Sequence, residues 1–220
     1  MFVSPLTAAL LLSSRQSGFD GLKALFKRAF DYQKIKQKIW YVPILLLSPG
    51  LYVLSYLVMR VMGWPLPDPI SIPLLLAPVF FCIYFLAGIC EELGWMGYAF
   101  DPLQNRWGVF KAGLILGIVW QLWHLIPDLQ AHYTASWIIW HDLQGVALRL
   151  LIVWIYTNTG KSVFAAILVH AMDNVSWSLF PNYGSGFDPF VTGMLTIIAA
   201  VIVIIGWGPN LLARQKKPLS

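Results

Sequence analysis

Long apolar stretches alternate with short polar segments along this chain of 220 residues. From residue 40 onward, the apolar stretches cover residues 40–62, 72–105, 110–126, 137–156, 162–180 and 190–207. A helix needs about 20 apolar residues to cross a bilayer, whereas a strand of a membrane barrel needs about 10 residues of alternating polarity. The pattern therefore predicts an all-α fold, a polytopic integral membrane helical bundle of about six to seven spans.

Turn-forming residues separate the predicted spans. Residues 63–71 are rich in proline, residues 127–136 are polar, and residues 181–189 contain glycine, aspartate and asparagine. Gly108 follows one span, at a position where a glycine commonly terminates a helix. Pro127 is expected to end the next span just before it. These segments predict short connections between neighbouring antiparallel helices.

The N-terminal region has a different pattern. Residues 1–14 are apolar but short for a span, and no basic segment precedes them as in a signal peptide. We expect a short or truncated first helix here. Residues 15–38 alternate basic and apolar side chains, which predicts a basic interfacial helix in the lipid headgroup region; a dedicated lipid- or partner-binding arm is the alternative. The apolar stripe of this helix has helical spacing and comprises Leu22, Leu25, Phe26 and Phe30.

Composition supports membrane insertion. Hydrophobic residues make up 58% of the chain and charged residues 11%, and the mean hydropathy is +0.68, whereas soluble domains contain about 25% charged residues. The net charge of +5 does not indicate nucleic-acid binding, because the basic residues gather at 15–38 and 214–217, which suits a cytoplasmic membrane face. We divide the chain into the short apolar and basic helices of residues 1–39, a transmembrane bundle of residues 40–207 and a basic cytoplasmic tail of residues 208–220.

The distribution of positive charge predicts the orientation of the spans. If residues 15–38 are cytoplasmic, alternation places Arg106, Lys111, Lys161 and the basic tail on the same side. The three loops on the opposite side contain no lysine or arginine. Because positive residues flank the cytoplasmic ends of spans, the charges support the span count. The expected location is a bacterial plasma membrane.

Two adjacent carboxylates, Glu91 and Glu92, lie deep inside one predicted span. A charge at the centre of a membrane helix costs roughly 2.5–3.5 kcal/mol on insertion scales, so intramembrane acids mark functional sites. Glu91 and His124 lie about 16 residues on either side of the turn between their helices, which at ~1.5 Å per residue puts both about 24 Å from that end. His170 and Asn174 are one turn apart on a third span. We expect these residues to converge on one buried pocket.

Several chemical interpretations of this group are open. Any single member can be a buried polar contact between helices, although several such groups on three helices at compatible depth favour a shared site. Glu91 can act as a general base on water, or Glu91, His124 and His170 can bind zinc with one open position. The residues alone do not separate these chemistries. His132 and His141, in or beside a loop, are predicted to be non-catalytic.

Three ordered motifs on successive spans carry a resemblance to a known family. They are EExxxM at residues 91–96, WxxxH at residues 120–124 and HxxxN at residues 170–174. The set resembles the CPBP family, the CAAX prenyl proteases and bacteriocin-processing enzymes also called Abi proteins. The motifs of that family are EExxxR, an aromatic residue followed by xxxH, and Hxxx followed by Asn, Asp or Ser. The resemblance covers about residues 72–180 and implies an intramembrane protease.

The resemblance also implies a role for each residue of the predicted site. Glu91 would act as a general base on water, and Glu92 as a supporting acid or polar anchor. His124 would hold or polarise that water. His170 and Asn174 would stabilise the oxyanion or, in a metal-dependent mechanism, add a ligand. The metal would then be zinc held by Glu91, His124 and His170.

One position departs from the family pattern. Met96 stands at the sixth position of the first motif, where the family has an arginine four residues after the second glutamate. That spacing would pair the arginine with Glu92 along the helix. Arg149, inside the span at 137–156, is the candidate to replace it, and Asp142 is the alternative partner of Arg149. Both pairings are hypotheses.

The leading functional hypothesis is an intramembrane endopeptidase that cuts a membrane-associated peptide near the cytoplasmic half of the bilayer. By the resemblance, its partners would be membrane lipid and a prenylated C-terminal peptide or a small leader-bearing peptide, with no nucleic acid. The alternative is a non-proteolytic or weakly active family member that acts as a membrane binding, immunity or scaffold protein. A proton-relaying transporter is a third hypothesis, which the small number of spans and the lack of an inverted repeat disfavour.

Overall fold

The chain folds into a bundle of helices, and the computed structural model describes residues 3–211. The α-helices are α1 (Ser4–Arg28), α2 (Tyr41–Val61), α3 (Ala77–Gly94), α4 (Phe100–Trp107), α5 (Val109–Gln130), α6 (Ala135–Asn158), α7 (Val163–Leu179) and α8 (Pro189–Trp207). A π-helical segment, Trp95–Ala99, joins α3 to α4, and short 3-10 turns occupy Tyr32–Lys34, Lys38–Trp40 and Leu74–Leu76. No strand occurs among the described residues, so the predicted all-α fold is confirmed.

Five helical segments are long and apolar enough to cross a membrane. They are Lys38–Val61, Leu74–Trp107, Val109–Gln130, Ala135–Asn158 and Pro189–Trp207. α7 is a sixth, shorter apolar helix of 17 residues. These segments correspond to the predicted spans, and the protein is an integral membrane bundle. Most of the predicted basic tail of residues 208–220 lies outside the described part of the chain, from residue 212 onward.

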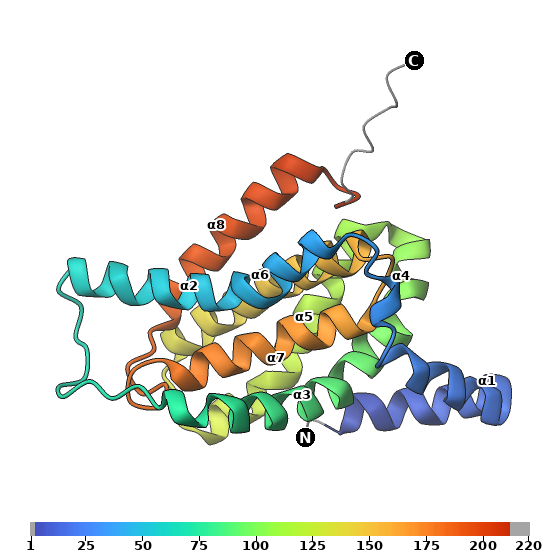
Figure 1. Cartoon of the computed structure of the whole chain (residues 1–220), viewed down its shortest axis with the longest axis horizontal. Coiled ribbons are helices and arrows are strands. Elements are labelled where there is room, and N and C mark those ends of the chain that lie inside the picture. Colours follow the sequence, from blue (N-terminus) through green and yellow to red (C-terminus); the bar gives the residue numbers. More distant parts are fainter. Residues whose placement is uncertain (1–2, 212–220) are drawn as a thin grey trace, which may run out of the picture.

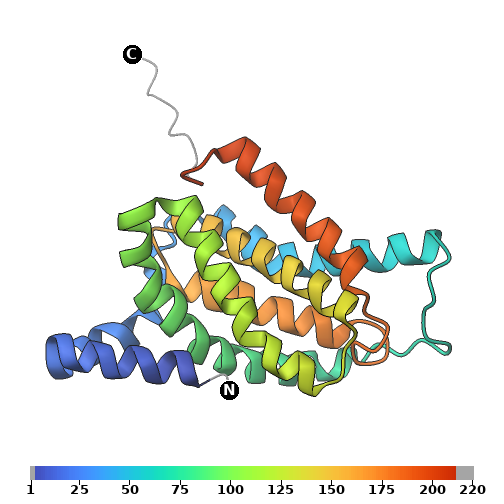
Figure 2. The ribbon, with the colours of Figure 1, turned by 180° about the vertical axis from the view of Figure 1, so that it is seen from behind.

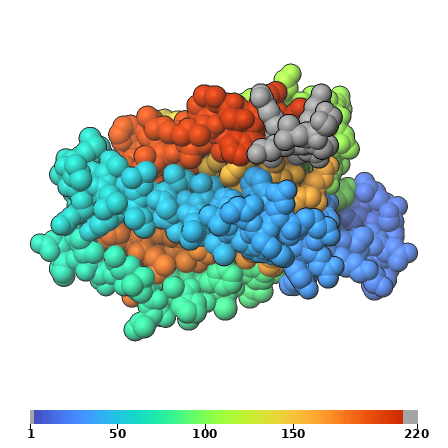
Figure 3. Space-filling view, turned by 45° about the horizontal axis from the view of Figure 1, so that its top comes forward, coloured from blue at the N-terminus to red at the C-terminus, as the bar shows by residue number. Residues whose placement is uncertain are grey.

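The helices α6 and α7 form the centre of the bundle. α6 packs against α5 and α8, whereas α7 packs against α2 and α3. Figure 1 shows α2 and α7 running alongside each other, and Figure 2 shows α5 on the opposite face of the molecule. In the space-filling view of Figure 3, α2 covers part of α7. The central position of the two helices follows from their runs of buried side chains at 147–156 and 165–171.

A glycine and two capping hydroxyl groups mark the ends of helices next to the connections. Gly108, at φ 78°, separates α4 from α5, as its position in the sequence predicted. Thr134 caps α6 by accepting a hydrogen bond from the backbone N–H of Trp137 at 3.2 Å. Ser162 caps α7 in the same way, by accepting from the backbone N–H of Ala165 at 3.2 Å. These hydroxyl groups satisfy N–H groups that have no partner within the first helical turn.

The predicted end of the span at 110–126 is wrong. α5 continues through Pro127 to Gln130. A proline removes one backbone donor from a helix, but the carbonyl of Pro127 still accepts from the N–H of Ala131 at 2.8 Å. The final turn therefore remains hydrogen-bonded. It places Asp128, which is buried, on the helix instead of in a loop.

The N-terminal region also differs from the prediction. One helix, α1, covers most of the two predicted segments and is broken near Gly18, at φ 56°. It ends at Arg28, and residues 29–40 form turns and short 3-10 segments instead of the remainder of a basic helix. Of the predicted apolar stripe, Leu25 is buried in the core and Phe26 is exposed. The basic segment is thus partly built into the bundle.

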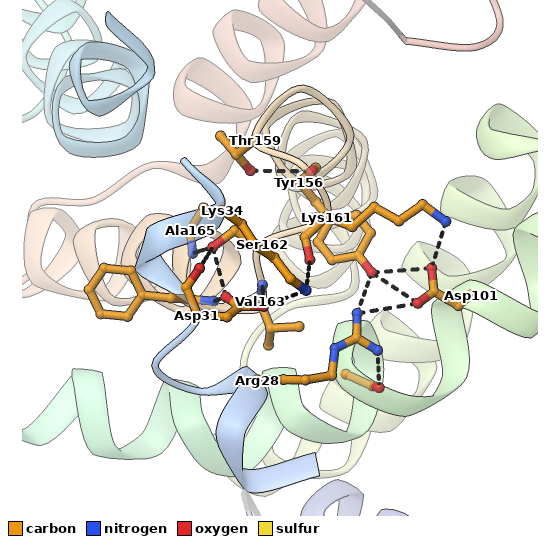
Figure 4. A network of polar contacts seen from close by, with 12 residues as sticks. Arg28, Asp31, Lys34, Asp101, Tyr156, Thr159, Lys161, Ser162, Val163 and Ala165 are labelled. Carbon is orange, nitrogen blue, oxygen red and sulfur yellow. Dashed lines mark hydrogen bonds and ion pairs between the residues drawn. The ribbon is translucent and has the colours of Figure 1, made fainter. Parts of the chain in front are cut away.

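A polar cluster, which we call the basic-end cluster, holds Arg28 against the bundle (Figure 4). Arg28 lies 3.2 Å from the Asp101 carboxylate and donates to the Tyr156 hydroxyl and the Gly97 carbonyl, both at 2.6 Å. Lys161 lies 3.2 Å from the same Asp101. The cluster joins the end of α1 to α4, α6 and the start of α7. Arg28 is therefore a structural cation as well as a part of the basic segment.

Candidate active site

Four of the five predicted site residues line one cavity of about 350 Å³. Glu91 enters it from α3, His124 from α5, and His170 and Asn174 from α7. The structure thus brings together residues that are up to 83 positions apart, as the helical depths suggested. Glu92 is not part of the cavity wall. It is fully buried next to it, at 0% exposure.

Glu91 and Glu92 lie near the end of α3, directly before the π-helical segment Trp95–Ala99. A π-helical turn interrupts the regular repeat of an α-helix and is frequent at functional sites. Gly94 lies between Glu92 and the π-helical segment and faces α1, because a Cβ atom at this position would lie 2.6 Å from the backbone of Pro5. The glycine therefore allows α1 to pack closely on α3 at the level of the glutamates.

Trp120 connects Glu91 with His124. Its indole Nε1–H donates to Glu91 Oε2 at 3.0 Å, and its backbone carbonyl accepts from His124 Nδ1 at 2.9 Å. Because a carbonyl oxygen can only accept, Nδ1 carries the hydrogen, and Nε2 of the neutral imidazole carries a lone pair. Glu91 Oε1 and His124 Nε2 are therefore the atoms with which these two side chains can hold a molecule in the cavity.

Glu92 is the centre of a buried network beside the cavity. One carboxylate oxygen accepts from Arg149 Nη1 at 2.7 Å, and the other accepts from His170 Nδ1 at 2.8 Å. The Arg149 guanidinium also lies over the Trp120 ring, 4.1 Å from its centroid, in the geometry of a cation–π contact. The network pairs a buried charge that would otherwise be costly. It also fixes the orientation of His170, as carboxylate–histidine pairs do.

Arg149 replaces the missing arginine of the first motif. Met96, at the motif position, is fully buried among apolar side chains of the core. The hypothesis that Arg149 pairs with Glu92 is confirmed by the 2.7 Å contact between their side chains. Within the described residues, no ion pair joins Arg149 to Asp142, so the alternative pairing is wrong. The Arg149 guanidinium on α6 thus supplies a positive charge to Glu92, whereas an arginine of the EExxxR pattern would stand at position 96, four residues after Glu92.

Two further acids and one further histidine line the cavity. Asp128 on α5 and Asp173 on α7 were not selected from the sequence, although an acid inside an apolar span is a usable signal. His141, predicted to lie in or beside a loop, is on α6, which begins at Ala135, and its Nδ1 lies 2.9 Å from Asp128 Oδ2. His141 thus lies in the second turn of α6, beside the α5–α6 connection, and its non-catalytic role stays a prediction. His132 lies in the turn after α5 and is exposed.

The donor atoms of the predicted zinc ligands are of the kinds that zinc binds. Each predicted histidine keeps Nε2 available, and Glu91 keeps one carboxylate oxygen, which are ligands that zinc accepts. In the described part of the chain, however, a different group brings its possible ligand atoms within 4.8 Å of one another. That group consists of Asp128, His141 and Asp142. A zinc ion bound by Glu91, His124 and His170 stays a prediction.

Comparison with known proteins agrees with this geometry. The family model described as type II CAAX prenyl endopeptidase Rce1-like matches residues 73–176. A relative, CAAX prenyl protease 2 of Methanococcus maripaludis, is 28% identical over 216 residues, with 92% of this chain and 78% of the relative covered. The chain is therefore similar to the CAAX prenyl proteases of the CPBP family over most of its length. All five predicted site residues lie inside the region that the family model matches.

The apolar helices and the similarity to CAAX endopeptidases together indicate an integral membrane protein. Its three motifs are the segments that meet around the cavity and the Glu92 network. Met96 stands at the sixth position of the first motif, and Arg149 is the residue that pairs with Glu92.

Proposed function

We propose that this protein is an intramembrane endopeptidase of the CPBP family in which Glu91 activates a water molecule. The observation that supports the proposal is the grouping of Glu91, His124, His170 and Asn174 around one cavity. Glu91 provides a carboxylate base, His124 provides a hydrogen-bond acceptor, and His170 and Asn174 provide N–H donors. Hydrolysis of an amide requires groups of these kinds. The CAAX protease family supports peptide hydrolysis as the reaction.

In the first step, Glu91 removes a proton from a water molecule. The Trp120 indole occupies Glu91 Oε2, so Oε1 accepts this proton. His124 Nε2 accepts the second hydrogen of the water and thereby directs an oxygen lone pair toward the peptide carbonyl. As the proton moves to Glu91, the water oxygen bonds to the carbonyl carbon. A positioned general base of this kind contributes about 10²–10⁴-fold to the rate.

In the second step, the site stabilises the oxyanion of the tetrahedral intermediate. Asn174 offers its amide N–H, and the imidazolium form of His170 offers Nε2–H. Protonation of His170 balances the buried charges, since Glu91 and Glu92 are two carboxylates and Arg149 supplies a single positive charge. The C–N bond then breaks, and Glu91 returns its proton to the leaving amine.

Glu92 acts as a positioning residue in this mechanism. It does not line the cavity, and both of its oxygens already accept hydrogen bonds, from Arg149 and from His170. It holds the His170 ring with Nδ1 toward the network and Nε2 available for the reaction.

The test is cleavage of a quenched fluorescent peptide library by the purified protein in detergent. Glu91→Gln keeps the size of the side chain and removes the base, so we expect cleavage to fall about 10²–10⁴-fold. Asp68→Asn, which neutralises an exposed acid outside the cavity, is the matched control and is expected to match the wild type. Full cleavage by Glu91→Gln would refute the role of Glu91 as general base.

The substrate that we propose is a membrane-associated peptide. The name of the relative, CAAX prenyl protease 2, points to a prenylated C-terminal peptide as one class. A small leader-bearing peptide is the second class that the family suggests. Cleavage requires an extended segment of the peptide, because the cavity of about 350 Å³ admits a few side chains and not a folded domain.

A further inference from the structure

We propose that Asp128, His141 and Asp142 form a binding site for a divalent transition-metal ion, Zn²⁺ or Mn²⁺, where the end of α5 meets the start of α6. Each of the three side chains offers one ligand atom, and these atoms lie within 4.8 Å of one another. None of the three belongs to the predicted zinc ligands of the active site. The metal site does not depend on the proposed hydrolysis, so either proposal can fail without the other.

Two consecutive helices supply the ligands. Asp128 belongs to the last turn of α5, and His141 and Asp142 are adjacent on the second turn of α6. The backbone carbonyl of Asp128 accepts a hydrogen bond from the N–H of Tyr133 at 3.3 Å, which closes the turn that follows α5. The two helix ends are thereby held close together. Each ligand is therefore positioned by a helix and not by a loop.

Contacts around the His141 ring fix its orientation. Its Nδ1 lies 2.9 Å from Asp128 Oδ2, and the ring packs on Trp137 with the centroids 4.7 Å apart. Tyr133 in turn stacks on Trp137 at 3.7 Å. Ligand atoms around a tetrahedral zinc ion are about 3.4 Å apart, because each bond is about 2.1 Å long. Atoms that lie within 4.8 Å of one another can therefore reach one ion by side-chain shifts of about 1 Å.

The charges of this group are unbalanced without a cation. Two carboxylates face one imidazole, and among the described residues no lysine or arginine forms an ion pair with either aspartate. The contact with His141 accounts for Asp128, which is 7% exposed. Asp142 Oδ1 is buried and accepts no hydrogen bond from the described residues. Buried charges in proteins are paired or bind metal ions, and a divalent ion would balance both carboxylates.

A buried amide beside the group is a second indication of a ligand. Gln121 lines the same cavity as Asp128 and His141 and is 5% exposed, and its Oε1 accepts no hydrogen bond from the described residues. The amide lies against Gly145, one turn after His141 on α6, because a Cβ atom at Gly145 would overlap it. A carbonyl oxygen that is buried without a donor is costly. A water molecule bound to the ion would supply that donor.

The types of ligand select the class of ion. An imidazole nitrogen together with carboxylate oxygens suits zinc and manganese, whereas magnesium and calcium prefer oxygen ligands alone. Three protein ligands leave at least one coordination position open, and Asp128 and His141 border the cavity. A bound ion would therefore tie the end of α5 to the start of α6 and present an open position to the cavity.

The test is binding of Zn²⁺ and Mn²⁺ to the purified full chain in detergent, after a chelator has removed all metal ions. We expect a single ion per chain by mass spectrometry of the metal content, and a rise in Tm of about 5–10 °C at 100 times the dissociation constant. His141→Gln and Asp142→Asn are expected to lose both the ion and the Tm shift. The matched controls His132→Gln and Asp68→Asn, at exposed positions outside the group, are expected to keep both.

X-ray absorption at the zinc edge of the loaded wild type counts the imidazole ligands, and it decides the question if either variant fails to fold. One imidazole is expected here, whereas a zinc ion on Glu91, His124 and His170 would have two. The proposal is overturned by two imidazoles, by the absence of saturable binding of either ion, or by binding that His141→Gln and Asp142→Asn retain.

The variant Glu91→Gln separates this proposal from the proposed hydrolysis. It is expected to lose cleavage and to keep the ion, because Glu91 is not a ligand of the metal site. Full cleavage by Glu91→Gln with the ion retained would refute the general base and leave the metal site standing. Loss of the ion in Glu91→Gln would place the metal at the active site and overturn the site on Asp128, His141 and Asp142.

Discussion

Replacing Arg149 by methionine is expected to destabilise the folded protein strongly. In the wild type, the Arg149 guanidinium pairs with Glu92 and packs over the Trp120 ring. Methionine fills a similar volume but removes the charge, so that Glu92 keeps only His170 as a partner. The variant therefore isolates the electrostatic contribution of the arginine from most of its packing.

The expected loss of stability in Arg149→Met follows from the burial and spacing of the Glu92–Arg149 pair. Both side chains are 0% exposed and their charged atoms are 2.7 Å apart, at which an effective dielectric constant of ~20 gives an attraction of about 6 kcal/mol. Desolvation offsets part of it, and removal of one partner of a buried pair costs about 3–5 kcal/mol. A protein of this size loses about 2–4 °C of Tm per kcal/mol, so the Tm should fall by about 6–20 °C.

The assay is thermal unfolding of the purified protein in detergent. Arg60→Met, at an exposed arginine of α2, is the matched control and should change the Tm by no more than about 2 °C. The double variant Arg149→Met with Met96→Arg restores the family arrangement, with the arginine four residues after Glu92, and should recover part of the loss. A Tm of Arg149→Met equal to that of Arg60→Met would refute the assignment of this pair as stabilising.

Two further predictions concern the surroundings of the glutamates. Trp120→Phe removes the indole donor to Glu91 and should lower kcat about 10- to 100-fold, measured with the cleaved peptide. Unchanged kcat would contradict the role of this hydrogen bond. Gly94→Ala places a Cβ 2.6 Å from the backbone of Pro5 and should cost about 1–3 kcal/mol in unfolding free energy. Gly50→Ala is the matched control, because its Cβ would meet no heavy atom within 4 Å, and it should raise the unfolding free energy by up to about 1 kcal/mol. Equal effects of the two alanine substitutions would show that α1 does not pack tightly on α3.

The spans and the meeting of the motif residues could be predicted because both depend on short-range rules. Bilayer thickness sets the length of an apolar helix, and the turn at Gly108 places Glu91 and His124 at matching depth. The spacing of His170 and Asn174 puts both on one face of α7. Each of these inferences uses distances along a single helix or across a single hairpin.

The contacts between non-consecutive helices could not be predicted with the same precision. That Trp120 would stand between Glu91 and His124 depends on the rotation of α5 about its axis, which an apolar helix does not reveal. Asp128 was assigned to a loop because Pro127 was expected to stop the helix, although the last turn keeps its hydrogen bond. The Glu92–Arg149 pair was one of two arrangements that the sequence allowed, and packing of α6 against its neighbours decided between them.

The ionic contacts along α6 have a consequence for the permeability of the membrane. The Glu92–Arg149 pair lies beside the cavity, and the basic-end cluster lies seven residues further along α6, at Tyr156. These two layers of paired charges separate the cavity from the end of the bundle that carries Arg28 and Asp101. A site built this way can admit a peptide to the interior of the bundle without opening a path for ions. It is unlike a transporter, which exposes its site to each side of the membrane in turn.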